Sequence, residues 1–377
     1  MKTKALNIHK QLYQNLINRV DANRYTNYLK DELEISNMDD CIFSTAEHIA
    51  TFNIKNTVSF LLPQLLLQHF KILKKRNIVI LGGSLVSLDN MDYPRGFYLI
   101  DDKKRAFNLF SQKQKKTTTL LNDQLAYENI QDKNRDIFFK KFEFLKKEFQ
   151  IYHKDFAHQQ SEIMKNIIQK WSFDSGDIYI KPLEYVSKNI LIKLLETNDN
   201  SISLLFNNIE IFKQDTYNIF CSWTETKGTF LFWEVEEKRL NRIIYNDKKF
   251  IGKNLKFTAN STEILKLLKH NKILPSVSLS LFIVSWLPNI PIAGGHRQYW
   301  YWQYMIESFD KIFKTKSKKK LSQFGYNQLN FSELDILSNY GTGLDLAINN
   351  IDKKRLFKDV FDLSVYESDR KDGFYED

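Results

Sequence analysis

The chain is poor in cysteine, with only 2 among its 377 residues, Cys41 and Cys221. Two thiols so far apart in the sequence exclude a disulfide-based scaffold and any CxxC-type zinc or iron–sulfur site. No HExxH sequence or other close histidine pair suited to joint metal ligation occurs either. The sequence therefore predicts reduced thiols, as in a cytoplasmic protein, and no metal site.

Long hydrophobic segments are also missing. The longest run with few polar residues, 274–287, is shorter than the roughly 20 residues that a membrane-spanning helix needs. The first ten residues lack the apolar core of a secretory signal. We therefore expect a soluble, cytoplasmic protein without a membrane span.

Several familiar catalytic and cofactor motifs do not occur. The sequence contains no GxGxxG, no GxxxxGK[ST] and no GxSxG, so neither standard nucleotide-phosphate loop nor the nucleophile elbow of α/β-hydrolases is present. These absences leave the identity of any cofactor open. No motif resembles a named family closely enough to transfer residue roles.

Aromatic and basic residues are abundant. Hydrophobic residues make up 43% of the chain, and 29 Phe, 18 Tyr and 6 Trp can fill a substantial core, which argues against wholesale disorder. The formal net charge of +10 is compatible with a polyanionic partner. The alternative, which we favour, is lysine spread along the chain by coding bias, because no Arg-rich tract concentrates the charge.

The first half of the chain has the pattern of an α/β layer. Helices are expected over 7–34 and 56–75, and the continuous apolar run at 77–84 predicts a buried strand. A second strand is expected at 97–100. Residues 123–171 contain no Gly or Pro, which favours one long helix or a helical pair.

The second half begins with short β-prone runs and returns to helix. The runs at 202–206, 217–223, 230–235 and 242–245 predict an antiparallel meander, and helices are expected at 261–269 and from the glycine pair to about 313. The overall prediction is an α/β or α+β fold whose C-terminal helices return to the first half. Its regions would be 1–122 (α/β), 123–171 (long helical segment), 172–258 (β-meander) and 259–377 (C-terminal helices completing the site).

The strongest candidate site is the cluster Gly294, Gly295, His296, Arg297 and Gln298, which follows an apolar run and precedes an aromatic stretch. Two glycines allow close backbone approach to a ligand, and a helix beginning after them would direct free N–H groups at an anion. His296 is a candidate acid/base, and Arg297 a candidate clamp for a carboxylate or phosphate. A tight turn with surface side chains is an equally good interpretation.

Two further segments are candidates for the same site. Glu47 and His48 lie just before a predicted helix, where they can orient or protonate a substrate, although a structural histidine is the simpler interpretation. Arg95, between Pro94 and Gly96, is a candidate carboxylate clamp or an exposed turn residue. We expect the C-terminal helices to bring His296 and Arg297 near these groups.

The functional hypothesis is a cytosolic enzyme, a transferase or ligase, that acts on a small anionic metabolite. His296, His48 and Glu47 would be catalytic, whereas Arg297, Arg95, Gln298, Gly294 and Gly295 would bind the substrate. One alternative is a nucleic-acid-binding protein that uses its lysine-rich helix at 134–170. The other is a non-catalytic interaction protein with the long helix as its binding surface.

Overall fold

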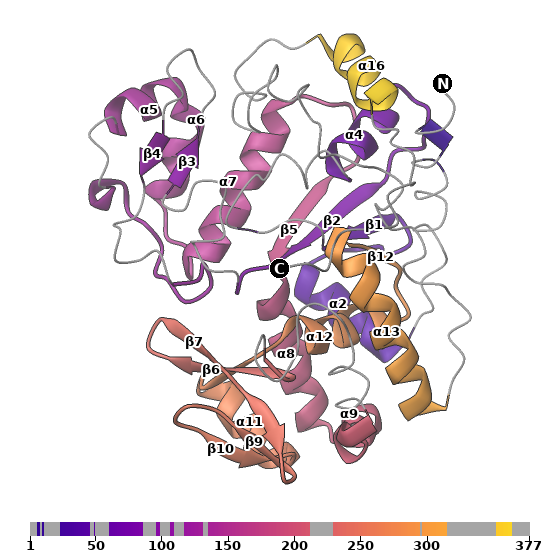
Figure 1. The fold of residues 1–377 in the computed structure, drawn as a ribbon. Helices are drawn as coiled ribbons and strands as arrows, with labels where there is room; N and C mark the ends of the chain where they lie inside the picture. The colour runs from indigo at the N-terminus through magenta and orange to yellow at the C-terminus, as the bar shows by residue number, and fades with distance from the viewer. Residues whose placement is uncertain are drawn as a thin grey trace, which may run out of the picture.

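The centre of the molecule is a four-stranded parallel sheet in the order β12-β1-β2-β5 (Figure 1). The computed structural model describes residues 6–7, 10, 23–45, 49, 60–85, 96–98, 106–108, 117–130, 135–211, 229–294, 296–314 and 352–363. The four strands of the sheet are β1 (Cys41–Ser44), β2 (Asn77–Gly82), β5 (Ile178–Pro182) and β12 (Ile292–Ala293).

Helices cover both faces of this sheet (Figure 1). One face is covered by α4 (Leu61–His69) and α7 (Phe156–Lys170), with α16 (Lys353–Leu363) packed on α4. The other is covered by α2 (Arg24–Leu33), α8 (Leu183–Glu196), α12 (Val277–Leu281) and α13 (His296–Phe313). Successive strand residues point to opposite faces, so Ile78 and Ile80 join one core and Val79 and Leu81 the other. This burial on both sides explains the continuous apolar run of β2.

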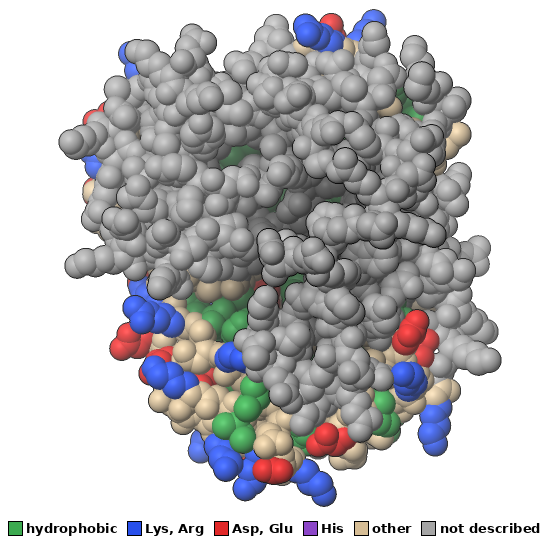
Figure 2. All heavy atoms as spheres, viewed as in Figure 1, with side chains coloured by type: hydrophobic (Ala, Val, Ile, Leu, Met, Phe, Trp, Pro, Cys, Tyr) green, Lys and Arg blue, Asp and Glu red, His purple; other side chains and the backbone are tan. Residues whose placement is uncertain are grey.

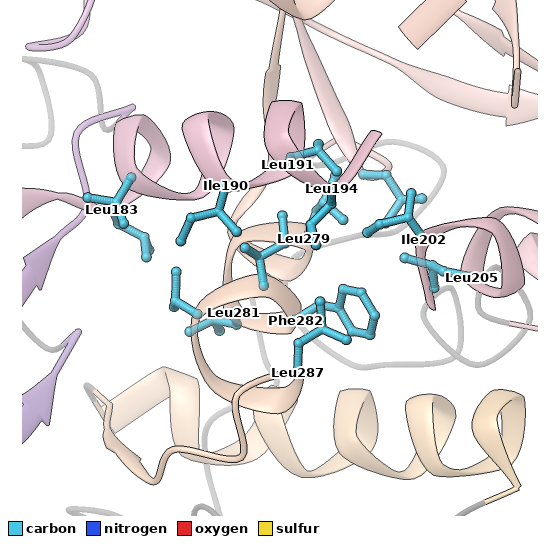
Figure 3. Close-up of a cluster of buried hydrophobic side chains, with 14 of the residues drawn as sticks. Leu183, Ile190, Leu191, Leu194, Ile202, Leu205, Leu279, Leu281, Phe282 and Leu287 are labelled. Atoms are coloured by element: carbon cyan, nitrogen blue, oxygen red, sulfur yellow. The ribbon is translucent and has the colours of Figure 1, made fainter. Parts of the chain in front are cut away.

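The core beneath the second face is built where α8 meets α9 (Asn200–Asn207) and α12 (Figure 3). Ile190 and Leu194 of α8 lie beside Leu279 and Phe282. Helix α12 continues into a π-helical turn, η5 (Phe282–Trp286), which leads to β12. Packing on α8 thus fixes the approach of the chain to the edge of the parallel sheet.

The remaining elements extend from this layered body (Figure 1). Between β2 and α7 lie a two-stranded pair and short helices: β3 (Gly96–Tyr98), β4 (Ala106–Asn108), η3 (Tyr127–Asn129), α5 (Arg135–Lys141), α6 (Glu143–Lys146) and η4 (Lys147–Phe149). Among the described residues between α9 and α12 are two small antiparallel sheets, β10-β9-β8 and β11-β6-β7, and the helix α11. Their bounds are β6 (Phe232–Glu236), β7 (Arg239–Arg242), β8 (Ile244–Asn246), β9 (Lys249–Ile251), β10 (Lys256–Thr258), α11 (Ser261–Lys269) and β11 (Ile273–Pro275).

The α/β or α+β class is confirmed, as is the return of the C-terminal part to the first half, because β12 pairs with β1 and α16 packs on α4. The helix at 261–269 and the strand beginning at Asn77 have the predicted positions. The antiparallel region is present at 232–258, where strands overlap the runs predicted at 230–235 and 242–245, and the run predicted at 217–223 lies outside the described residues. The region boundaries at 122, 171 and 258 stay a prediction.

The strand predicted at 202–206 is wrong, because this segment forms α9. The Asp199 carboxylate accepts a hydrogen bond from the Ser201 N–H and caps the helix. Ile202, Leu205 and Phe206 are buried at the i, i+3, i+4 spacing of a helix face. The amino-acid composition favoured a strand, but the cap at Asp199 and the spacing of the buried residues favour the helix that forms.

The single long helix considered for 123–171 is divided into shorter ones. Phe142 interrupts the helical backbone between α5 and α6, and Asp155 starts α7 anew by accepting a hydrogen bond from the His158 N–H. α7 has 15 residues and packs against β5. No helix among the described residues is long and apolar enough to cross a membrane.

Candidate ligand site at the carboxyl edge of the sheet

The order of the parallel strands reverses at β1. From β1 the chain proceeds to β2 and then β5 on one side, whereas β12, reached last, lies on the other side of β1. Open α/β sheets bind ligands outside the carboxyl ends of their strands at such a reversal, because the connections there diverge to opposite faces. The topology therefore directs attention to the segments that follow β1 and β12.

Those two segments leave the sheet side by side. Ser44 pairs with Ala293, and the Thr45 N–H donates to the Ala293 carbonyl at 2.8 Å. The chain continues from Thr45 into Ala46, Glu47 and His48, and from Gly294 toward α13, which begins at His296. The two candidate segments predicted from the sequence, 47–48 and 294–298, thus follow adjacent strands of the sheet.

The predicted site residues are described to different extents. Gly294 is half-buried beside the end of β12. For His296, Arg297 and Gln298 the backbone alone is described, as the first turn of α13. Glu47, His48, Arg95 and Gly295 lie outside the described residues. Their roles stay predictions, and adjacency to β1 and β12 applies to the backbone positions only.

The glycines at the end of β2 have a packing role. A Cβ atom at Gly82 would overlap the side chain of Ile49, and the Ile49 N–H donates to the Gly83 carbonyl at 3.1 Å. The Ser84 N–H is also occupied, since it donates to the Glu184 carboxylate. The Gly82-Gly83-Ser84 sequence therefore joins the ends of β1 and β2 and does not direct the Ser84 N–H toward a ligand.

Glu184 is a buried carboxylate that the sequence did not reveal. It lies in the first turn of α8, directly after β5, and its Oε2 accepts hydrogen bonds from the Ser84 N–H at 2.8 Å and Oγ at 2.7 Å. Burial raises the pKa of Glu184, while the hydrogen bonds from Ser84 oppose that rise. The Ser84 carbonyl accepts from Thr119 Oγ1 at 2.8 Å. Glu184 thus clamps the loop after β2 across 100 residues of sequence.

The described residues contain no group of three or more His, Cys, Asp or Glu side chains placed to hold a metal ion. Cys41 is buried in β1, its Sγ donates to the Asn37 carbonyl at 3.3 Å, and burial raises the pKa of its thiol to about 12. A thiol so rarely ionised is a poor nucleophile. Cys41 is therefore a core residue.

No protein-family model matches this chain, and no curated protein shows significant similarity to its sequence.

Proposed function

We propose that the protein is a cytosolic enzyme of group transfer or ligation that binds a small anionic metabolite in the crevice between β1 and β12. The observation that supports it is the reversal of strand order at β1, with the segment leading to Glu47 and His48 beside the start of α13. Ligands of open α/β sheets bind at this position.

The chemistry of the two segments suits an anion. α13 has 18 residues and begins at His296 immediately after the glycine pair, so its first N–H groups and its dipole favour a negative charge. In this proposal Arg297 clamps a carboxylate or phosphate, and Gln298 donates to it. His296 and His48 transfer protons, and Glu47 orients one of them or binds an amine.

The two alternative functions have less support. On the described part of the face in Figure 2, basic and acidic side chains are interspersed, without a continuous basic surface. Within 134–170, Lys141, Lys146 and Lys170 lie over aromatic rings at 5.0–5.8 Å from the ring centroids. The interaction-protein hypothesis relied on a long exposed helix, and α7 is buried against the sheet along one face.

A thermal-shift screen tests the proposal. The purified chain is heated with amino acids, nucleotides with magnesium, acyl-CoAs, sugar phosphates, and short DNA or RNA. A ligand of the folded state at one hundred times its Kd stabilises the protein by about 2.7 kcal/mol. We expect stabilisation by one small-anion class, and Arg297→Ala to weaken its binding about 10–100-fold through loss of a charged hydrogen bond.

Arg239→Ala is the matched control, because Arg239 is an exposed arginine of β7, in the antiparallel region. It should leave the shift unchanged. Stabilisation by nucleic acid alone, equal in both variants and lost at high salt, would favour the nucleic-acid alternative.

A further inference from the structure

A second cluster of polar side chains lies where the first turns of α7 and α8 meet. Asp155 Oδ1 accepts hydrogen bonds from the His158 N–H at 3.0 Å and lies 2.8 Å from His158 Nδ1. The His158 ring meets the ring of Tyr185 edge-on, with 4.6 Å between centroids. Lys154 Nζ donates to the Tyr185 hydroxyl at 2.8 Å and lies 4.0 Å from its ring centroid.

Lys188 adds a second ammonium group to this cluster. It follows Tyr185 by three residues on α8 and therefore lies on the same helix face. Its Nζ donates to the side chain of Asn271. Burial lowers the pKa of Lys188, and the positive charge of Lys154 lowers it further, so the two ammonium groups repel each other.

In the part of the chain that the structure describes, neither ammonium group has a carboxylate partner. Among the described residues, no carboxylate lies within ion-pair distance of Lys154 or Lys188. The closest acid in sequence, Asp155, is held by His158. Lys193, which is also on α8, is by contrast paired with Glu32 at 2.7 Å.

Such an arrangement is unfavourable in isolation. Partial burial of an ammonium group without a counter-charge destabilises the folded state, and a second ammonium group nearby adds repulsion. An exposed cation–π contact of the Lys154–Tyr185 kind offsets only about 0.5–1 kcal/mol. An anion bound between the two ammonium groups would offset both the cost of burial and the repulsion.

We propose that Lys154, Tyr185 and Lys188 form a phosphate-binding subsite at the carboxyl end of β5. A phosphate dianion matches two ammonium charges, and its several acceptor oxygens can take the Lys154 and Lys188 ammonium protons together with the Tyr185 O–H. His158, which borders the same tyrosine ring, supplies a further donor when protonated. A single carboxylate has fewer acceptors and half the charge.

This subsite is separate from the crevice at β1 and β12. β5 lies two strands from β1, which corresponds to about 10 Å along the edge of the sheet. The two positions share an edge, so a phosphorylated second substrate held at β5 can extend toward a group held at β1. The proposal for the subsite does not depend on that second role.

Isothermal titration calorimetry with inorganic phosphate and with pyrophosphate tests the subsite, with acetate and succinate as carboxylate probes at constant ionic strength. We expect phosphate or pyrophosphate to bind the full-length chain more tightly than either carboxylate. Lys154→Gln and Lys188→Met should each weaken this binding at least tenfold. Lys188→Arg, which keeps the charge, should retain most of it.

Two controls make the result specific. Lys266→Gln changes an exposed lysine of α11 and should leave phosphate binding unchanged. Arg239→Ala, which changes an exposed arginine of β7, should also leave it unchanged. Circular dichroism of each variant confirms folding. Equal binding of phosphate by wild type, Lys154→Gln and Lys188→Met would overturn the proposal, as would equal affinities for succinate and phosphate.

Discussion

Two buried glutamates, Glu184 and Glu234, hold neighbouring turns in two different regions of the molecule. Glu184 accepts the N–H and hydroxyl of Ser84 at the carboxyl edge of the parallel sheet. Glu234, in β6, accepts the N–H groups of Lys253 and Asn254 and holds the turn between β9 and β10. Each carboxylate therefore replaces a missing backbone acceptor.

The surroundings of the two glutamates differ. Within the fully described stretch 229–294, no buried side-chain nitrogen or oxygen lacks a hydrogen-bond partner. Near the carboxyl edge of the parallel sheet, Thr118 Oγ1, Asn122 Oδ1 and both amide atoms of Gln64 have none. Thr118 and Asn122 precede α7, and Gln64 lies in the first turns of α4, the helix that leads from β1 to β2. Polar groups without partners inside a protein are unfavourable unless a ligand or water completes them.

This contrast distinguishes a region whose buried polar side chains are paired internally from the edge of the sheet where we propose that a ligand binds. The antiparallel region satisfies its polar groups internally, for example when Glu236 accepts from Asn241, Lys253 and Asn254 at 2.8–2.9 Å. Among the described residues, the carboxyl edge retains buried side-chain atoms without a hydrogen-bond partner on Gln64, Thr118 and Asn122. Variants of matched residues in the two regions test this difference.

The largest effect is expected for Glu234→Leu. The side chain is 1% exposed, and its loss leaves two backbone N–H groups without an acceptor, which destabilises by roughly 2–4 kcal/mol. Urea unfolding followed by circular dichroism gives the change in free energy. Glu234→Gln keeps one acceptor oxygen and should lose less. A change below about 0.5 kcal/mol for the leucine variant would contradict the role assigned to this carboxylate.

Glu184→Leu should destabilise less, by about 1–2 kcal/mol, although it also removes the acceptor of two hydrogen bonds. The smaller value follows because burial already opposes ionisation of Glu184, so an apolar side chain regains part of that free energy. The same urea experiment measures it. A loss of unfolding free energy larger than that of Glu234→Leu would contradict the proposal that the carboxylate in the antiparallel region contributes more to stability.

The pH dependence of stability distinguishes Glu184→Gln from wild type. Burial raises the folded-state pKa of Glu184 above its ordinary value of 4.5, so the folded state binds this proton more tightly than the unfolded state. The resulting stabilisation is complete below pH 4.5 and is lost as pH rises through the folded pKa. Because glutamine does not titrate, the variant should gain stability relative to wild type as pH rises. A difference that is constant between pH 4 and 8 would contradict this.

The smallest effect is expected for Gln64→Met. The amide is fully buried and makes no hydrogen bond, so a methionine of similar volume should leave stability unchanged or raise it by up to about 1 kcal/mol. Gln68→Met is the matched control. Gln68 Oε1 accepts the N–H groups of Arg76 and Gly176 at 3.0 and 3.1 Å, so that variant should be destabilised. Thermal unfolding of both variants tests the contrast.

The elements that sequence analysis predicted correctly are those with local signals. Residues 261–269 form α11 because Asn260 caps the helix and Ile264 and Leu268 recur on one face. The apolar run at Asn77 is the pattern of a doubly covered strand. The segment 202–206 was wrongly predicted as a strand because its composition favours one. The signal for a helix is the cap at Asp199, which lies three residues before this segment.

The carboxyl edge was harder to predict because its groups come from distant segments. Glu184 becomes buried only when β2 and β5 pair, and Ser84 lies 100 residues before it. Lys154 and Lys188 meet only because α7 packs on β5 and α8 follows it. The glycine pair before His296 was visible in the sequence, since glycines next to His and Arg form a local pattern. That the strand before this pair, β12, lies beside β1 could be known only from the order of the strands in the sheet.

Hydrogen exchange measured by mass spectrometry tests the central claim most directly. The chain is compared with and without the compound that stabilises it most in the screen, and with Arg297→Ala as a reference. The account predicts slower exchange in peptides spanning 41–49 and 290–300, where the ends of β1 and β12 lie, and no change across 232–258. Protection confined to 232–258, with none at 41–49 or 290–300, would contradict it.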